Sequence, residues 1–160
     1  MTSFANPLTE QLATFLRSIG LEVEQRALGD DCFLPGLALQ NGRIIIDEAK
    51  MLCPGDILHE AGHLATTPAA ERHLCGGNLA VGGGEEMAAI AWSYAAALYI
   101  GIDPAVVFHP HGYKRGSDSL LENFRAGRYL AVPLLQWMGL TFETKNSATP
   151  YPHMIRWLRE

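Results

Sequence analysis

Residues 56–65 decide the fold, and they read Asp56-Ile57-Leu58-His59-Glu60-Ala61-Gly62-His63-Leu64-Ala65. On a helix, His59 and His63 project from one face a single turn apart, because residues four apart are neighbours. Two imidazoles placed in this way can hold two corners of a tetrahedral zinc ion. Glu60 then lies beside the metal, where it can take a proton from a zinc-bound water. The alternative interpretation is a helix with two solvated histidines.

Length and composition favour one compact domain, residues 1–160. The chain is 48% hydrophobic and 18% charged, which is typical of a globular protein with a substantial core. A formal net charge of -5 gives no reason to expect nucleic acid or an anionic membrane as a partner. No signal sequence is expected at the N-terminus, and the longest uncharged run, 87–102, is short for a membrane span. The sequence therefore predicts a cytoplasmic protein that does not enter a membrane.

The chain has three cysteines, Cys32, Cys53 and Cys75, and none forms a C-x-x-C pair. A thiolate zinc site is therefore not expected from the spacing. Reduced, buried thiols are the simplest interpretation without an export signal. Cys53 lies six residues before His59 and can pack near it, but we do not expect it to be catalytic.

The remaining pattern predicts an α+β fold that is mainly helical. Two apolar runs flank Asn41-Gly42, the pair that best accepts the positive φ angles of a tight hairpin turn, so a small antiparallel sheet is expected before the His59 helix. Gly62 costs that helix about 1 kcal/mol relative to alanine, which indicates that another element packs closely against it. Helices are expected at 7–19, 54–67, 85–100, 119–126, 131–138 and 153–159.

Two histidines alone make a poor catalytic zinc site, because such sites have three protein ligands and a water. The acidic residues between His63 and the apolar helix 87–100 are Glu71, Glu85 and Glu86. Glu85 and Glu86 open this helix, where acidic residues are also favoured by the helix dipole. We expect one of this pair to be the third ligand.

The order of these elements resembles the ImmA/IrrE-type minimal gluzincins, a group of zincin-like metallopeptidases. The matching residues are Asn41-Gly42, 44–46, His59-Glu60-Ala61-Gly62-His63-Leu64, Glu86, Ala89 and Trp92. The resemblance covers residues 8–100 and implies that Glu86 is the third ligand, with Glu85 as runner-up. It also implies a zincin-like domain that binds one zinc ion and acts on a protein or peptide substrate.

The sequence thus predicts a zinc-dependent metallopeptidase that hydrolyses peptide bonds through a zinc-activated water, with Glu60 as general base. Peptide hydrolysis also requires a donor to the oxyanion, and His111 or Tyr113 could supply it. His109-Pro110-His111 could instead be a second metal site or a solvated loop. The alternative function is a non-catalytic zincin-like regulatory or interaction protein, in which the metal is structural or absent.

Overall fold

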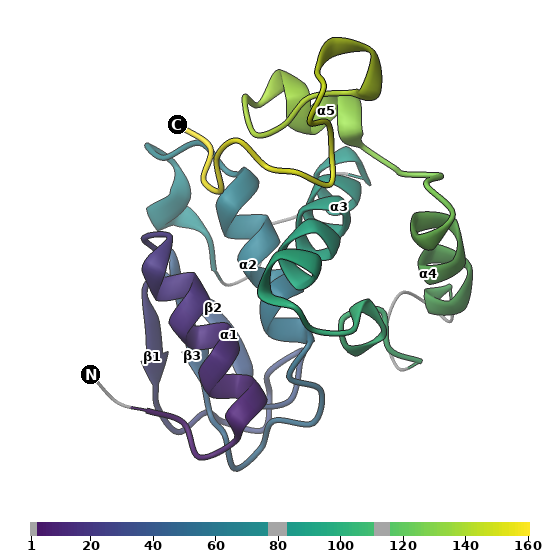
Figure 1. Cartoon of the computed structure of the whole chain (residues 1–160). Coiled ribbons are helices and arrows are strands. Elements are labelled where there is room, and N and C mark those ends of the chain that lie inside the picture. The colour runs from purple at the N-terminus through teal and green to yellow at the C-terminus, as the bar shows by residue number, and fades with distance from the viewer. Residues whose placement is uncertain (1–2, 77–82, 111–115) are drawn as a thin grey trace.

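The computed structural model describes residues 3–76, 83–110 and 116–160. The chain folds as a mainly helical α+β structure with a three-stranded sheet at one side (Figure 1). Its elements are α1 (Pro7–Ser18), β1 (Val23–Gln25), β2 (Leu37–Gln40), β3 (Arg43–Ile46), α2 (Asp56–Thr66), η1 (Arg72–Leu74), α3 (Gly83–Ile100), η2 (Pro104–Val106), α4 (Ser117–Arg125), α5 (Val132–Trp137) and η4 (Thr144–Asn146). Within the described ranges, no helix has both the length and the apolarity that crossing a lipid bilayer requires.

The predicted hairpin is present, with β2 and β3 paired antiparallel along their lengths. Asn41 and Gly42 form its turn with φ values of 53° and 77°, which glycine and asparagine tolerate best. The helices predicted from 7 to 138 are also present, with bounds that shift by a few residues. The sequence pattern therefore located these elements correctly.

The prediction of an antiparallel sheet is wrong in one respect. β1 pairs in parallel with β3, so the sheet is mixed and has the order β1-β3-β2. The three isoleucines of β3, 44–46, are completely buried. A strand buried on both faces suits the centre of a sheet, where each of its edges also finds a partner. Residues 26–36 return the chain so that β2 reaches the far side of β3.

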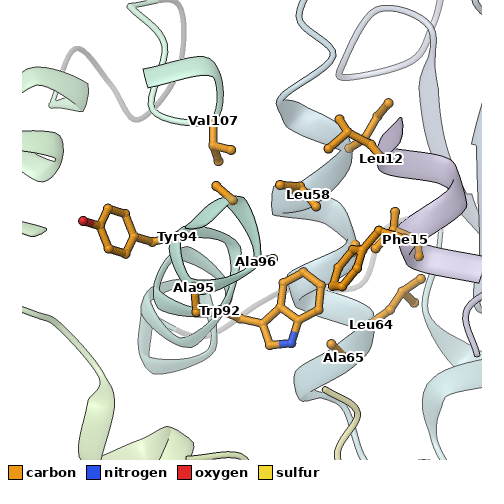
Figure 2. Packing of buried hydrophobic residues seen from close by; sticks show 14 of the residues in the cluster. Leu12, Phe15, Leu58, Leu64, Ala65, Trp92, Tyr94, Ala95, Ala96 and Val107 are labelled. Atoms are coloured by element: carbon orange, nitrogen blue, oxygen red, sulfur yellow. The ribbon is translucent and has the colours of Figure 1, made fainter. Parts of the chain in front are cut away.

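Helices α2 and α3 pack against each other at the centre of the molecule (Figure 1). A Cβ atom on Gly62 would lie 2.7 Å from the backbone oxygen of Ala89 in α3, closer than real Cβ atoms come. The prediction of a close neighbour at Gly62 is therefore confirmed, and that neighbour is α3. The buried side chains around this contact, shown in part in Figure 2, include Leu12, Phe15, Leu58, Leu64 and Trp92.

The C-terminal segment does not form the helix predicted for 153–159. Its polar groups bond to distant parts of the chain instead. The backbone N–H of Arg159 donates to the Ala65 carbonyl at 2.9 Å, and the carbonyl of Trp157 accepts from Nε1 of Trp92 at 2.9 Å. A helix this short gains little from its own hydrogen bonds, so contacts with α2 and α3 decide the conformation.

Candidate metal centre

The histidines of α2 face each other as the helical spacing predicts. Their Nε2 atoms lie 3.2 Å apart, and the two ring planes are nearly perpendicular at 87°. The side chains are largely buried, with 13% of His59 and 14% of His63 exposed. Ile57, Leu58 and Leu64, which are fully buried, fix the rotation of α2 and so direct both imidazoles to one place.

Glu86 in the first turn of α3 reaches both histidines. Its Oε1 lies 2.9 Å from Nε2 of His59, and its Oε2 lies 3.0 Å from Nε2 of His63. The close packing of α2 on α3 brings this carboxylate to the histidines. Glu85, the runner-up, is exposed and lines the neighbouring groove. Of the pair, the structure places Glu86 between the imidazoles, while its role as a ligand stays a prediction.

The donor atoms fit the requirements of a divalent ion. Two ligand atoms on a tetrahedral zinc ion lie about 3.3–3.6 Å apart, given bond lengths of about 2.0–2.2 Å. The separations among the nitrogens of His59 and His63 and the oxygens of Glu86 are 2.9–3.2 Å, so the donors need to move apart by only a few tenths of an ångström. His59, Glu60 and His63 also each offer a ligand atom within 4.8 Å of the others. His59, His63 and Glu86, with Glu60 beside them, could therefore hold a metal ion.

Glu60 is half-buried beside this cluster, and its partial burial is the main reason that the pKa of its carboxyl is raised. The histidines lower that pKa without cancelling the rise, and the carboxylates of Glu86 and Asp56 add to it. A carboxylate whose pKa lies closer to neutrality is a stronger base than an exposed one. Glu60 is thus suited to accept a proton.

The pKa of His63 and the pKa of Glu86 shift in opposite directions, because these two side chains hydrogen-bond to each other. Burial lowers the pKa of His63, but the hydrogen bond with Glu86 and the charge of Glu60 outweigh it, so the net pKa is raised. Hydrogen bonds with His59 and His63 hold the pKa of Glu86 well below its usual range. Hydrogen bonds with the two imidazoles therefore keep the Glu86 carboxylate ionised.

Two arginines satisfy the carbonyl groups at the C-terminal end of α2. Arg72 donates from Nε to the Leu64 carbonyl at 3.0 Å and from Nη2 to the carbonyls of Thr67 at 3.2 Å and Arg159 at 2.6 Å. Arg159 donates from Nη1 to the Thr66 carbonyl at 3.2 Å. Positive charge is favourable here because the helix dipole leaves this end negative. Sequence reasoning missed both residues, since the contact between Arg72 and Arg159 and that between Arg159 and Thr66 join distant parts of the chain.

We expect Arg72→Lys to lower the free energy of unfolding by about 1–3 kcal/mol, because lysine cannot reproduce the guanidinium fork that reaches three carbonyls. Urea unfolding measures this change. Arg43→Lys is the matched control, since Arg43 is exposed and pairs only with surface carboxylates, where an ion pair contributes about 0–1 kcal/mol. Equal stability losses in the two variants would contradict the role of Arg72.

A groove of about 840 Å³ lies beside Glu60 and His63. Strand β2, at an edge of the sheet, contributes all four of its residues to the lining. The exposed apolar side chains of Phe33 and Leu74 line it as well. Part of this edge is already used, because the N–H of Leu37 donates to the Leu34 carbonyl at 3.2 Å and Gly76 lies against the Leu39 carbonyl. The backbone groups of β2 that are left over could hydrogen-bond a short extended chain.

The other residues that the sequence singled out are His109, His111, Tyr113 and the cysteines. His111 and Tyr113, the proposed oxyanion donors, lie outside the described residues. His109 pairs with Asp56 through Nε2 and Oδ1 at 2.6 Å, at the start of α2. The cysteines are free thiols, as predicted, but all three are half-buried rather than buried. The structure raises the pKa of the Cys53 thiol by burial and by the nearby Asp56 carboxylate, which opposes a role as a nucleophile.

Comparison with known proteins does not assign this chain to a family. No family model, no curated protein and no solved structure matches the chain. Function is therefore inferred from the site itself.

Proposed function

We propose that this protein is a zinc-dependent metallopeptidase with His59, His63 and Glu86 as its metal ligands. The observation that carries the proposal is the position of Glu86, whose two carboxylate oxygens each face one of the two imidazoles. Two histidines and one carboxylate form a ligand set that catalytic zinc uses, and it leaves a fourth position for water or substrate. The zincin-like assignment of the fold rests on this same arrangement.

The residues around the ligands have separate tasks in this proposal. A bound zinc ion would supply Lewis acidity and lower the pKa of a water towards about 7. Glu60 accepts the proton of the attacking water and passes it to the leaving amine, which suits its burial and raised pKa. β2 holds the substrate as an extended peptide in the groove, so that the scissile carbonyl lies beside Glu60 and His63.

The first test is elemental analysis of the purified full-length protein, followed by an assay against unfolded protein substrates. We expect about one equivalent of zinc dependent on His59 and His63, and cleavage that a chelator stops. Protein that lacks this histidine-dependent zinc even after incubation with excess Zn²⁺ would overturn the proposal.

A pair of adjacent variants tests the third ligand. We expect Glu86→Ala to weaken zinc binding by about 100-fold or more, because it removes a ligand rather than an outer-shell partner. Glu85→Ala is the matched control, with the same charge change at the neighbouring position, and is expected to bind zinc almost as the wild type does. Competition with a chromophoric chelator measures both affinities. Equal zinc retention in both variants would contradict the assignment of Glu86.

A further inference from the structure

A second group of potential metal ligands lies one turn before Glu60, at the start of α2. It consists of Cys53, Asp56 and His109, each of which offers a ligand atom within 4.8 Å of the other two. All three residues are half-buried. We propose that these side chains form a second metal site, which takes a divalent ion of the zinc class through one sulfur, one oxygen and one nitrogen donor.

The turn that precedes α2 fixes two of the ligands relative to each other. The backbone N–H of Asp56 donates to the Cys53 carbonyl at 3.0 Å, which closes a tight turn around Pro54 and Gly55. Donors three residues apart on a tight turn form a chelating pair, as in metal knuckles built from two cysteines. Here the second position is Asp56, so a search for paired cysteines does not find this site.

The third ligand reaches this turn because two backbones are in contact. A Cβ atom on Gly55 would lie 1.9 Å from the carbonyl oxygen of Val106, so no other residue type fits there without moving the chain. Val107 and Phe108, both buried, then anchor the chain just before His109. The site is thus positioned by the packing of two segments more than fifty residues apart.

The positions of Asp56 and His109 already suit ion binding. Their Oδ1 and Nε2 atoms are 2.6 Å apart, and only 16% and 12% of the two side chains are exposed. A metal ion bound by Oδ1 and Nε2 would replace this hydrogen bond. The two atoms would have to move apart by several tenths of an ångström to make room for it. Binding of the ion would displace the proton of the Cys53 thiol, whose pKa burial and Asp56 raise, and the resulting thiolate and the Asp56 carboxylate together would neutralise a divalent cation.

The chemistry of the donor set narrows the choice of ion. Thiolate and imidazole ligands select zinc-class transition metals and disfavour calcium and magnesium, which prefer oxygen. Three protein ligands leave one position for a water molecule. Such an ion would join the segment before α2 to the segment after α3, and so would hold together the two helices that carry His59, His63 and Glu86.

Cobalt substitution of the metal-free, full-length protein tests this proposal. Co²⁺ bound by a thiolate absorbs in the near ultraviolet through sulfur-to-metal charge transfer, whereas Co²⁺ bound only by nitrogen and oxygen does not. We expect about two equivalents of Co²⁺ per chain with a charge-transfer band in the wild type. Cys53→Ser is expected to lose the band and one equivalent, and Cys32→Ser, the matched thiol control, to keep both.

The two metal sites are separated by further variants. The double variant His59→Ala, His63→Ala is expected to keep the charge-transfer band, so failure of the proposed peptidase site leaves this result intact. His109→Gln is expected to weaken binding at the second site by about 100-fold or more without removing a thiol, because it removes a ligand. Absence of the band in the wild type, or its persistence in Cys53→Ser, would overturn the second site. Circular dichroism establishes that each variant is folded.

Discussion

Glu60→Gln is expected to reduce the rate of peptide hydrolysis by about 10²- to 10⁴-fold while zinc content stays unchanged. Glutamine has nearly the same shape as glutamate and retains hydrogen-bonding ability at this half-buried position. It cannot accept a proton from water, so the step assigned to the carboxylate is lost. Steady-state cleavage of an unfolded protein substrate and elemental analysis of the same sample measure the two quantities.

This variant also distinguishes the peptidase from its non-catalytic alternative. A structural metal site has no need for a carboxylate next to its ligands, so Glu60→Gln would leave every property of such a protein unchanged. A variant that loses its zinc, or that cleaves at the wild-type rate, would contradict the role assigned to Glu60. Wild-type protein that binds zinc but cleaves none of a broad peptide library would favour the zincin-like regulator.

Gly62→Ala is expected to lower the free energy of unfolding by about 1–3 kcal/mol, the usual cost of overpacking a core. Alanine is the better helix former by about 1 kcal/mol, so the clash must exceed that gain. The new Cβ would lie 2.7 Å from a backbone oxygen of α3, and backbone has no side-chain rotamer by which to escape. Thermal unfolding should show a decrease in Tm of several degrees.

The same substitution is expected to weaken zinc binding, although Gly62 is not a ligand. Separation of α3 from α2 moves Glu86 away from His59 and His63, and ligand geometry tolerates only small displacements. Ser119→Ala, on the exposed side of α4, is the control and should change neither property. An increase in Tm for Gly62→Ala would show that helix propensity dominates and that the contact with α3 is not restrictive.

The parts of the fold that were predictable depend on local signals. The turn at Asn41-Gly42 and the helix around His59 follow from neighbouring residues, and both are present. The cost of Gly62 within a helix indicated a close neighbour, and α3 is that neighbour. Local signals of this kind survive in the folded chain because tertiary packing agrees with them.

The parts that were not predictable depend on long-range contacts. The parallel pairing of β1 with β3 joins strands that β2 separates along the chain, and no local pattern reveals it. The segment 153–159 has the apolar spacing of a short helix, yet its backbone bonds to the end of α2. The proximity of Cys53 and His109 likewise requires the fold, because a contact between backbones brings them together. The sequence therefore brought together the residues of the first proposed site, and it did not bring together those of the second.

The position of Glu86 has a mechanical consequence for the chain. Two proposed ligands lie on α2 and the third on α3, so a bound ion would act as a reversible crosslink between the helices. It would close the stretch of chain from His63 to Glu86 into a ring. A crosslink of this kind removes entropy from the unfolded chain, as a disulfide bond does. Loss of the ion would remove this crosslink, so metal binding and the stability of the contact between α2 and α3 would be coupled.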